Sequence, residues 1–149
     1  MDNSVPNLAS IMFLAEIKNR KILFTGDGRG EDIIRVLSNN GMLDKDGRIH
    51  MELLKVPHHG SDMNASIEFF EIVDANYYVI SANGRDDNPS LDTLRWIIET
   101  GKNSRIFRKI VFTNMTPNIK RVLNEYEQGR FHYRCIILEK EADFLSISL

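Results

Sequence analysis

The stretch Leu53-Leu54-Lys55-Val56-Pro57-His58-His59-Gly60-Ser61 decides the fold of this chain. It opens as a short apolar run, which is typical of a buried strand, and Pro57 removes a backbone donor where the ladder should stop. The two imidazoles therefore lie where a sheet gives way to a loop, a common position for binding and catalytic groups. Imidazole is a good ligand for zinc, copper, iron and nickel. A strand-ending turn with two solvent-exposed histidines is the alternative explanation.

A second apolar run, Lys21 to Thr25, ends in the same way and is followed by Gly26-Asp27-Gly28. Asp-Gly is ordinary turn chemistry, so this segment alone indicates only a turn. Two strands that each deliver a metal-capable side chain at their C-terminal end favour a site. We therefore interpret Asp27 as a candidate ligand beside the histidine pair.

These segments, with two others, carry a resemblance to a known family. In order along the chain they are Asn7 to Ser10, Ile22 to Asp27, Leu54 to Ser61, Val79 to Gly84, and Asn88-Pro89. Together they resemble the C-terminal half of a metallo-β-lactamase-fold hydrolase, and the ComEC/Rec2-like subgroup of competence proteins in particular. The resemblance runs from about Asn7 to Trp96.

The resemblance implies one or two metal ions, commonly zinc, with manganese as the alternative. In that pattern Asp27 matches the carboxylate that bridges the metals. His58 and His59 match the segment that supplies the late histidine ligand, and both are candidates, with His59 the first choice. Ser61 and Asn83 are candidates for supporting these ligands through hydrogen bonds.

The family's main metal motif, His-x-His-x-Asp-His, is absent. The four histidines are His50, His58, His59 and His132, and no two of them are two positions apart. A zinc site needs three or four protein ligands, and Asp27 with one or two histidines gives two or three. We therefore expect the isolated chain to bind zinc or manganese weakly or not at all and to show no strong hydrolase activity. If further ligands exist, the first candidates are Asp62, Asp86 and Asp87. Many relatives also have His-Pro where this chain has Asn88-Pro89.

Three functions fit these observations. The first is the C-terminal portion of a metal-dependent hydrolase, and the resemblance suggests a phosphodiester or a nucleic-acid backbone as its substrate. The second is a degenerate, non-catalytic domain that acts as a binding or assembly module. The third is an unrelated α/β domain with an accidental motif, because a fold hosts many functions.

Composition sets further bounds. The 149 residues are ordinarily one domain, 1–149, and 42% hydrophobic with 27% charged residues is typical of a globular protein. A net charge of −2 gives no support to general attraction to nucleic acid. We expect no membrane-spanning segment and no signal peptide. The single cysteine, Cys135, fits a buried position in a strand and, weakly, a cytoplasmic location.

Apolar periodicity and turn residues predict an α/β fold, a mixed sheet with flanking helices. The chain is expected to open with a hairpin of residues 10–18 and 21–25, with Asn19-Arg20 as its turn, and to close with a hairpin of residues 131–138 and 144–149 around 140–143. The expected helices are 31–39, 64–73, 89–100 and one that begins at 117. The expected strands between them are 50–56, 77–81 and 110–113. Asn88 is the expected cap of the third helix.

The hairpin Ile11 to Phe24 and the strands at Leu53, Val79 and Ile110 are apolar on nearly every residue, which is the pattern of strands buried on both faces. The family's half-fold has helices on one face of its sheet only. We therefore expect the other face to be covered by a missing N-terminal half-domain, by a second copy of the chain, or by the chain's own closing hairpin.

Overall fold

The structure is a computed structural model that describes residues 9–102, 104, 106–138, 144 and 146–149. Six strands form one mixed sheet in the order β1-β2-β3-β4-β5-β6. The β1 and β2 strands are antiparallel, and every later neighbour is parallel. This arrangement confirms the expected α/β fold with a mixed sheet. The strands are β1 Phe13–Ile17, β2 Arg20–Phe24, β3 Ile49–Lys55, β4 Val73–Ile80, β5 Arg108–Phe112 and β6 Tyr133–Ile137.

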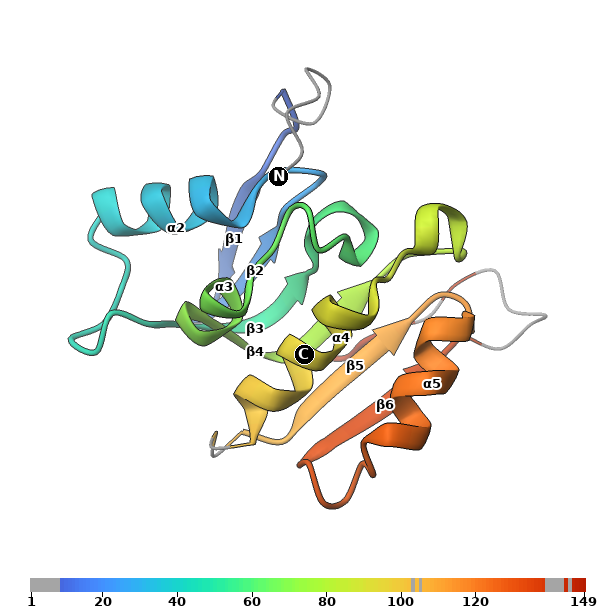
Figure 1. The fold of residues 1–149 in the computed structure, drawn as a ribbon. Coiled ribbons are helices and arrows are strands. Elements are labelled where there is room, and N and C mark those ends of the chain that lie inside the picture. The colour runs from blue at the N-terminus through green and yellow to red at the C-terminus, as the bar shows by residue number, and fades with distance from the viewer. Residues whose placement is uncertain (1–8, 103, 105, 139–143, 145) are drawn as a thin grey trace.

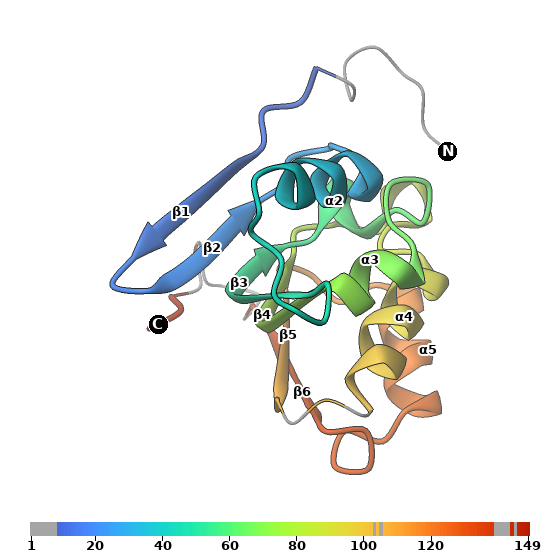
Figure 2. The same cartoon turned by 90° about the vertical axis from the view of Figure 1, so that its left-hand side faces the viewer.

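Four helices connect the parallel strands, one between each pair of neighbours. They are α2 Gly30–Asn39, α3 Ile67–Ile72, α4 Leu91–Gly101 and α5 Pro117–Glu125. Crossovers between parallel strands are right-handed, and the strand order advances in one direction only, so every helix falls on the same side. The four helices therefore cover one face of the sheet (Figures 1 and 2). Among the described residues, none of the four lies against the other face. The described part of the chain holds no helix that is long and apolar enough to cross a membrane.

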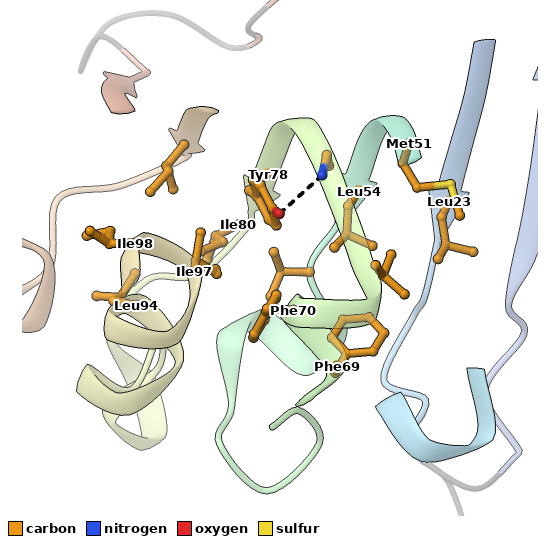
Figure 3. Close-up of a cluster of buried hydrophobic side chains, with 14 of the residues drawn as sticks. Leu23, Met51, Leu54, Phe69, Phe70, Tyr78, Ile80, Leu94, Ile97 and Ile98 are labelled. Carbon is orange, nitrogen blue, oxygen red and sulfur yellow. Dashed lines mark hydrogen bonds between the residues drawn. The ribbon is translucent and has the colours of Figure 1, made fainter. Parts of the chain in front are cut away.

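The core lies between the helices and the sheet. Strand register aligns Leu23, Leu54, Tyr78 and Ile110 in one row, and each is at most 4% exposed. Helix side chains pack onto this row (Figure 3), and they include Phe69, Phe70, Leu94, Ile97 and Ile98. Burying side chains of this size stabilises the fold by about 1.5–3 kcal/mol each. Tyr78 keeps its hydroxyl satisfied by donating to Asp74 Oδ1 at 3.0 Å.

Hydroxyl side chains cap three of the helices. Ser66, Ser90 and Thr116 accept hydrogen bonds from the backbone N–H groups three residues later, at the starts of α3, α4 and α5. The α5 start at Thr116-Pro117 is as predicted. The predicted Asn88 cap of α4 is wrong, because Ser90 caps that helix and Pro89 lies before its first residue.

Three other predicted boundaries are wrong. The hairpin loop is Lys18-Asn19, with φ of 51° and 65°, and Arg20 already pairs with Ile17 in the ladder. This is the backbone that a two-residue turn between twisted strands requires. The α3 helix begins at Ile67 and not at Asn64, because Asn64 precedes the Ser66 cap. The β4 strand begins at Val73, directly after α3, and not at Tyr77.

The closing hairpin is only partly borne out. The β6 strand is present, but Phe144 and Ser146 to Leu149 carry no strand. The predicted turn 140–143 lies outside the described residues, as does Asn7 at the start of the resembling region. Figure 2 places the C-terminus on the side of the sheet away from the helices.

Candidate functional site at the carboxyl edge of the sheet

The loops that follow β2, β3 and β4 meet at one edge of the sheet. These strands are parallel, so their carboxyl ends lie together, where open α/β sheets hold their ligands. His58 N–H donates to Gly26 O at 3.0 Å and ties the second loop to the first. Thr25 Oγ1 donates to Lys55 O at 2.6 Å and fixes the point where the two strands end. The sequence therefore brings the Asp27 loop and the histidine pair together, as predicted.

Asp27 is held by its backbone and leaves its carboxylate partly exposed. Its N–H donates to Ser10 Oγ at 2.9 Å. Gly26 makes this contact possible, since its φ is +51° and a Cβ there would lie 2.4 Å from the same hydroxyl oxygen. The Asp27 side chain is 39% exposed. The loop thus orients Asp27 without using the carboxylate oxygens for its own support.

The histidine pair adopts a backbone that residues with a side chain seldom take. His58 and His59 have φ of 42° and 57°, and Gly60 follows at 85°. A left-handed residue other than glycine costs on the order of 1–3 kcal/mol and persists where the surroundings impose it, often at functional sites. Gly60 packs so closely that a Cβ there would lie 2.7 Å from Cβ of Pro89. The strained turn is therefore locked by its neighbours.

The His59 ring is oriented by a carbonyl. Its Nδ1 lies 2.5 Å from Ser81 O at the end of β4. A carbonyl can only accept, so Nδ1 carries a proton, and in the neutral ring the lone pair is then on Nε2. Nε2 lies 3.8 Å from Asp27 Oδ1, and the His59 side chain is 51% exposed. The lone pair of His59 and the carboxylate of Asp27 thus share one small region.

The His58 ring is oriented in the same way by an amide. Asn64 is 2% exposed, and its Nδ2 donates to Asp27 O at 2.9 Å. Its Oδ1 therefore faces His58 Nδ1, at 2.7 Å, and accepts that proton. Asn64 also accepts from Gly30 N–H through its backbone oxygen at 2.8 Å. Sequence reasoning missed Asn64, although its place six residues after His58 and just before a capped helix was a signal.

The donor atoms of this site are of the types that bind a metal ion, but there are too few of them. Zinc bonds of about 2.0–2.1 Å place two tetrahedral ligands about 3.4 Å apart, so the 3.8 Å between His59 Nε2 and Asp27 Oδ1 suits a shared ion. Metal-binding histidines also donate their other nitrogen to a carbonyl or carboxylate, as both do. However, within the described ranges no three His, Cys, Asp or Glu side chains converge as a metal site would require. The described residues therefore do not form a complete zinc site by themselves.

The other sequence candidates are placed less directly. Ser61 is buried, and its Oγ accepts from Met63 N–H at 3.2 Å. Asn83 Oδ1 accepts from Arg85 N–H at 3.0 Å and supports the loop after β4. Both therefore support turns. Asp62 and Asp87 are exposed and lie outside the converging groups.

A cleft of about 410 Å³ opens beside the histidines. Its walls come from the ends of β3, β4 and β5, and Arg85 is the basic side chain, besides the histidines, that lines it. Asp86 faces the same cleft with its side chain 82% exposed, and it lies 3.8 Å from the Arg85 guanidinium. The remaining lining is Ala82 and five residues with amide or hydroxyl side chains, Ser81, Asn83, Asn88, Thr113 and Asn114. Most of the side chains that line the cleft are thus polar, which suits a ligand that takes several hydrogen bonds.

Comparison of the chain with protein-family models, with curated proteins and with solved structures finds no match.

Proposed function

We propose that this chain supplies Asp27 and His59, with His58 beside them, to the centre of a metal-dependent hydrolase of the metallo-β-lactamase type. The observation that carries the proposal is the 3.8 Å approach of His59 Nε2 to Asp27 Oδ1. His59 directs Nε2 toward Asp27 because its Nδ1 is held by the Ser81 carbonyl, and the Nδ1 of His58 is held by Asn64. A second support is the sequence resemblance, which rests on the order of the Thr-Gly-Asp and Pro-His-His-Gly-Ser segments along the chain.

The remaining ligands of this centre come from a second half-domain, in the same protein or in a separate chain. The described residues supply too few donors for a zinc ion, which takes three or four. When bound, zinc or manganese would polarise an ester or phosphodiester oxygen and activate a water. The chain's own groups would orient the ion, and the polar cleft beside His59 would take the substrate.

A second function, a non-catalytic binding or assembly module, is favoured by a separate observation. The sheet face away from the helices keeps exposed aromatic side chains, Phe13 at 53% and Phe24 at 37%. A degenerate domain would retain such a face for assembly after losing its chemistry. Metal binding at His59 distinguishes the two functions.

The test is a zinc titration of the ¹⁵N-labelled chain, read from the imidazole nitrogens by NMR. We expect the Nε2 resonance of His59 to shift first, at millimolar zinc, and the isolated chain to hydrolyse a model phosphodiester no faster than a blank. His50 and His132 are internal controls, because both are exposed and neither is at this edge. Asp27→Asn, which removes the charge and keeps the shape, should abolish the early shift at His59.

Two results would contradict the proposal. If His59 responds no earlier than His50 and His132, then Asp27 and His59 do not form a shared site. If zinc binds stoichiometrically below the micromolar range and the binding is lost in Asp27→Ala, the ligand set is already complete and no second half is needed.

A further inference from the structure

The sheet face away from the helices carries two regular rows of side chains. One row is Ala15, Ile22, Leu53, Tyr77, Lys109 and Arg134, and the other is Phe13, Phe24, Lys55, Val79, Val111 and Ile136. The alternate row, which contains Leu54 and Tyr78, packs under the helices. Because successive strand residues point to opposite faces, these two rows lie on the face away from the helices, where Val111 is only 3% exposed and Phe13 and Phe24 on the hairpin are the more exposed.

The apolar part of this face is most exposed on the β1–β2 hairpin. The rings of Phe13 and Phe24 stack with centroids 4.6 Å apart, and they are 53% and 37% exposed. Ile17 lies on the same face of β1 and is 60% exposed. Exposed aromatic and aliphatic groups gathered in this way are typical of interaction surfaces.

The charged side chains of the two rows have one sign. Lys55, Lys109 and Arg134 are basic, and neither row contains a carboxylate. Lys109 Nζ donates to Tyr77 OH at 2.7 Å and lies 4.3 Å from the centroid of that ring. Lys55 Nζ donates to Val56 O at 3.0 Å, and the Asp27 carboxylate at the carboxyl edge also acts on its charge. The two rows are therefore basic, although the whole chain has a net charge of −2.

We propose that this face docks a surface of another protein segment that is apolar and carries carboxylates opposite Lys55, Lys109 and Arg134. Two copies of the chain meeting through this face would bring like charges together, which costs stability and selects against such a dimer. An acidic partner removes that repulsion and covers Phe13 and Phe24 at the same time.

The inference deepens the proposed function in one respect. Lys55 lies three residues before His58, and its backbone oxygen holds Thr25 at the edge where the metal ligands gather. A partner docked against this face would therefore reach the same edge and could bring the missing ligands. The docking itself is measured without any metal, so its failure and that of the metal site are separate results.

The probe is a twelve-residue peptide of the repeat Val-Ser-Glu-Ser, which presents valine and glutamate on the same face when it is extended. We expect it to bind the ¹⁵N-labelled full chain and to shift the amide resonances of the two rows. Peptides in which lysine replaces every glutamate, or serine replaces every valine, should bind at least tenfold more weakly, because the first lacks the carboxylates and the second lacks the apolar groups.

Two variants locate the binding. Arg134→Glu should weaken the acidic peptide at least fivefold, while Lys120→Glu, which makes the same charge change at an exposed position on α5, should not. Phe13→Ser should weaken binding as strongly as Arg134→Glu, since it removes exposed apolar area without altering charge.

Three outcomes would overturn the proposal. The first is equal binding of the glutamate and lysine peptides, or shifts confined to residues outside the two rows. The second is a dimer at high concentration that Phe13→Ser dissociates, which would make a second copy the partner. The third is no peptide binding together with protected amides at Ile147 and Leu149, which would make the chain's own C-terminal residues, on this side of the sheet, the permanent cover (Figure 2).

Discussion

The two edges of the sheet hold charged groups in opposite ways. At the amino edge Arg108 is 2% exposed, and its guanidinium lies 2.7 Å from Asp74 Oδ1. At the carboxyl edge the side chains of Asp27 and His59 are 39% and 51% exposed, and their nearest polar atoms are 3.8 Å apart. The charged groups of the amino edge pair with one another. At the carboxyl edge both imidazoles are held through Nδ1, and His59 directs Nε2 toward Asp27.

The amino edge is satisfied almost completely. Arg108 donates to Ile97 O, in the last turns of α4, and to Thr100 Oγ1 at 2.8 Å, where the helix end favours a positive charge. Asp74 accepts from Tyr78 and from Ser104 at 3.2 Å as well as from Arg108. Burial and the neighbouring Asp74 together raise the pKa of Tyr78 well above its ordinary value, although Arg108 opposes this, so its hydroxyl stays a donor. Of the buried side-chain polar atoms in the described residues, Arg108 Nε alone lacks a hydrogen-bond partner, so this cluster serves mainly to specify the fold.

The largest effect should come from breaking the amino edge. Arg108→Met leaves Asp74 without its counter-charge, and removing one partner of a buried pair costs about 3–5 kcal/mol. Chemical denaturation should therefore show a large loss in the free energy of unfolding. Asp74→Asn combined with Arg108→Met should recover part of it.

The matched control for this prediction is Arg121→Met. Arg121 pairs with Glu125 on the surface of α5, with 60% of its side chain exposed, and exposed pairs contribute little. The free energy of unfolding of Arg121→Met should be nearly that of the unchanged chain. If Arg108→Met lowered the free energy of unfolding equally little, the amino-edge cluster would not stabilise the fold, and the contrast between the two edges would be lost.

The second effect concerns the strained turn at the carboxyl edge. Gly60→Ala adds a methyl group at φ +85° and 2.7 Å from Pro89, so it combines a left-handed penalty of about 1–2 kcal/mol with overpacking of about 1–3 kcal/mol. Gly47→Ala is the control, because Gly47 has φ +72° but no atom within 4 Å of a Cβ. Gly47→Ala should show only the left-handed penalty.

Thermal and denaturant unfolding of both variants measure the difference. A Gly60→Ala loss no greater than that of Gly47→Ala would mean that Pro89 yields easily. The backbone of the histidine turn would then be flexible, and its neighbours would not hold it in the left-handed conformation.

Much of the fold could be predicted from the sequence because its signals are local. The α5 start at Thr116-Pro117, the α2 helix and the strand that ends at Pro57 each follow from residues within a few positions. The boundaries of α3 and α4 were missed because Ser66 and Ser90 are the caps, and nothing local excludes Asn64 or Asn88. The Lys18-Asn19 turn was missed by one residue, since it depends on the register between β1 and β2.

The candidate site was only half predictable. Proximity of Asp27 to the histidines follows from parallel strands that end at one edge, and the structure brings Asp27 and His59 together. Asn64, Ser10 and the Ser81 carbonyl, which orient the site, come from three separate segments. No periodicity links such residues, because only the packed fold makes them neighbours. The role of Asp27, His58 and His59 as metal ligands remains a prediction.

The smallest effect concerns Lys55, where the carboxyl edge meets the sheet face away from the helices. Desolvation lowers the pKa of Lys55, while the charge of Asp27 opposes that shift. Between this lowered pKa and the ordinary value of 10.5 the unfolded chain binds more protons than the folded chain, so stability rises with pH through this window.

Lys55→Met should raise the free energy of unfolding on the order of 0.5 kcal/mol below the window, and the gain should shrink as the pH passes 10.5. Denaturation at pH 7 and at the alkaline end tests this, with Lys120→Met as the exposed control. A loss of stability in Lys55→Met at pH 7 would show that its bond to Val56 O outweighs desolvation. Lys55 would then belong with Arg108, as a charge that the fold uses for itself and not one that awaits a partner's carboxylate.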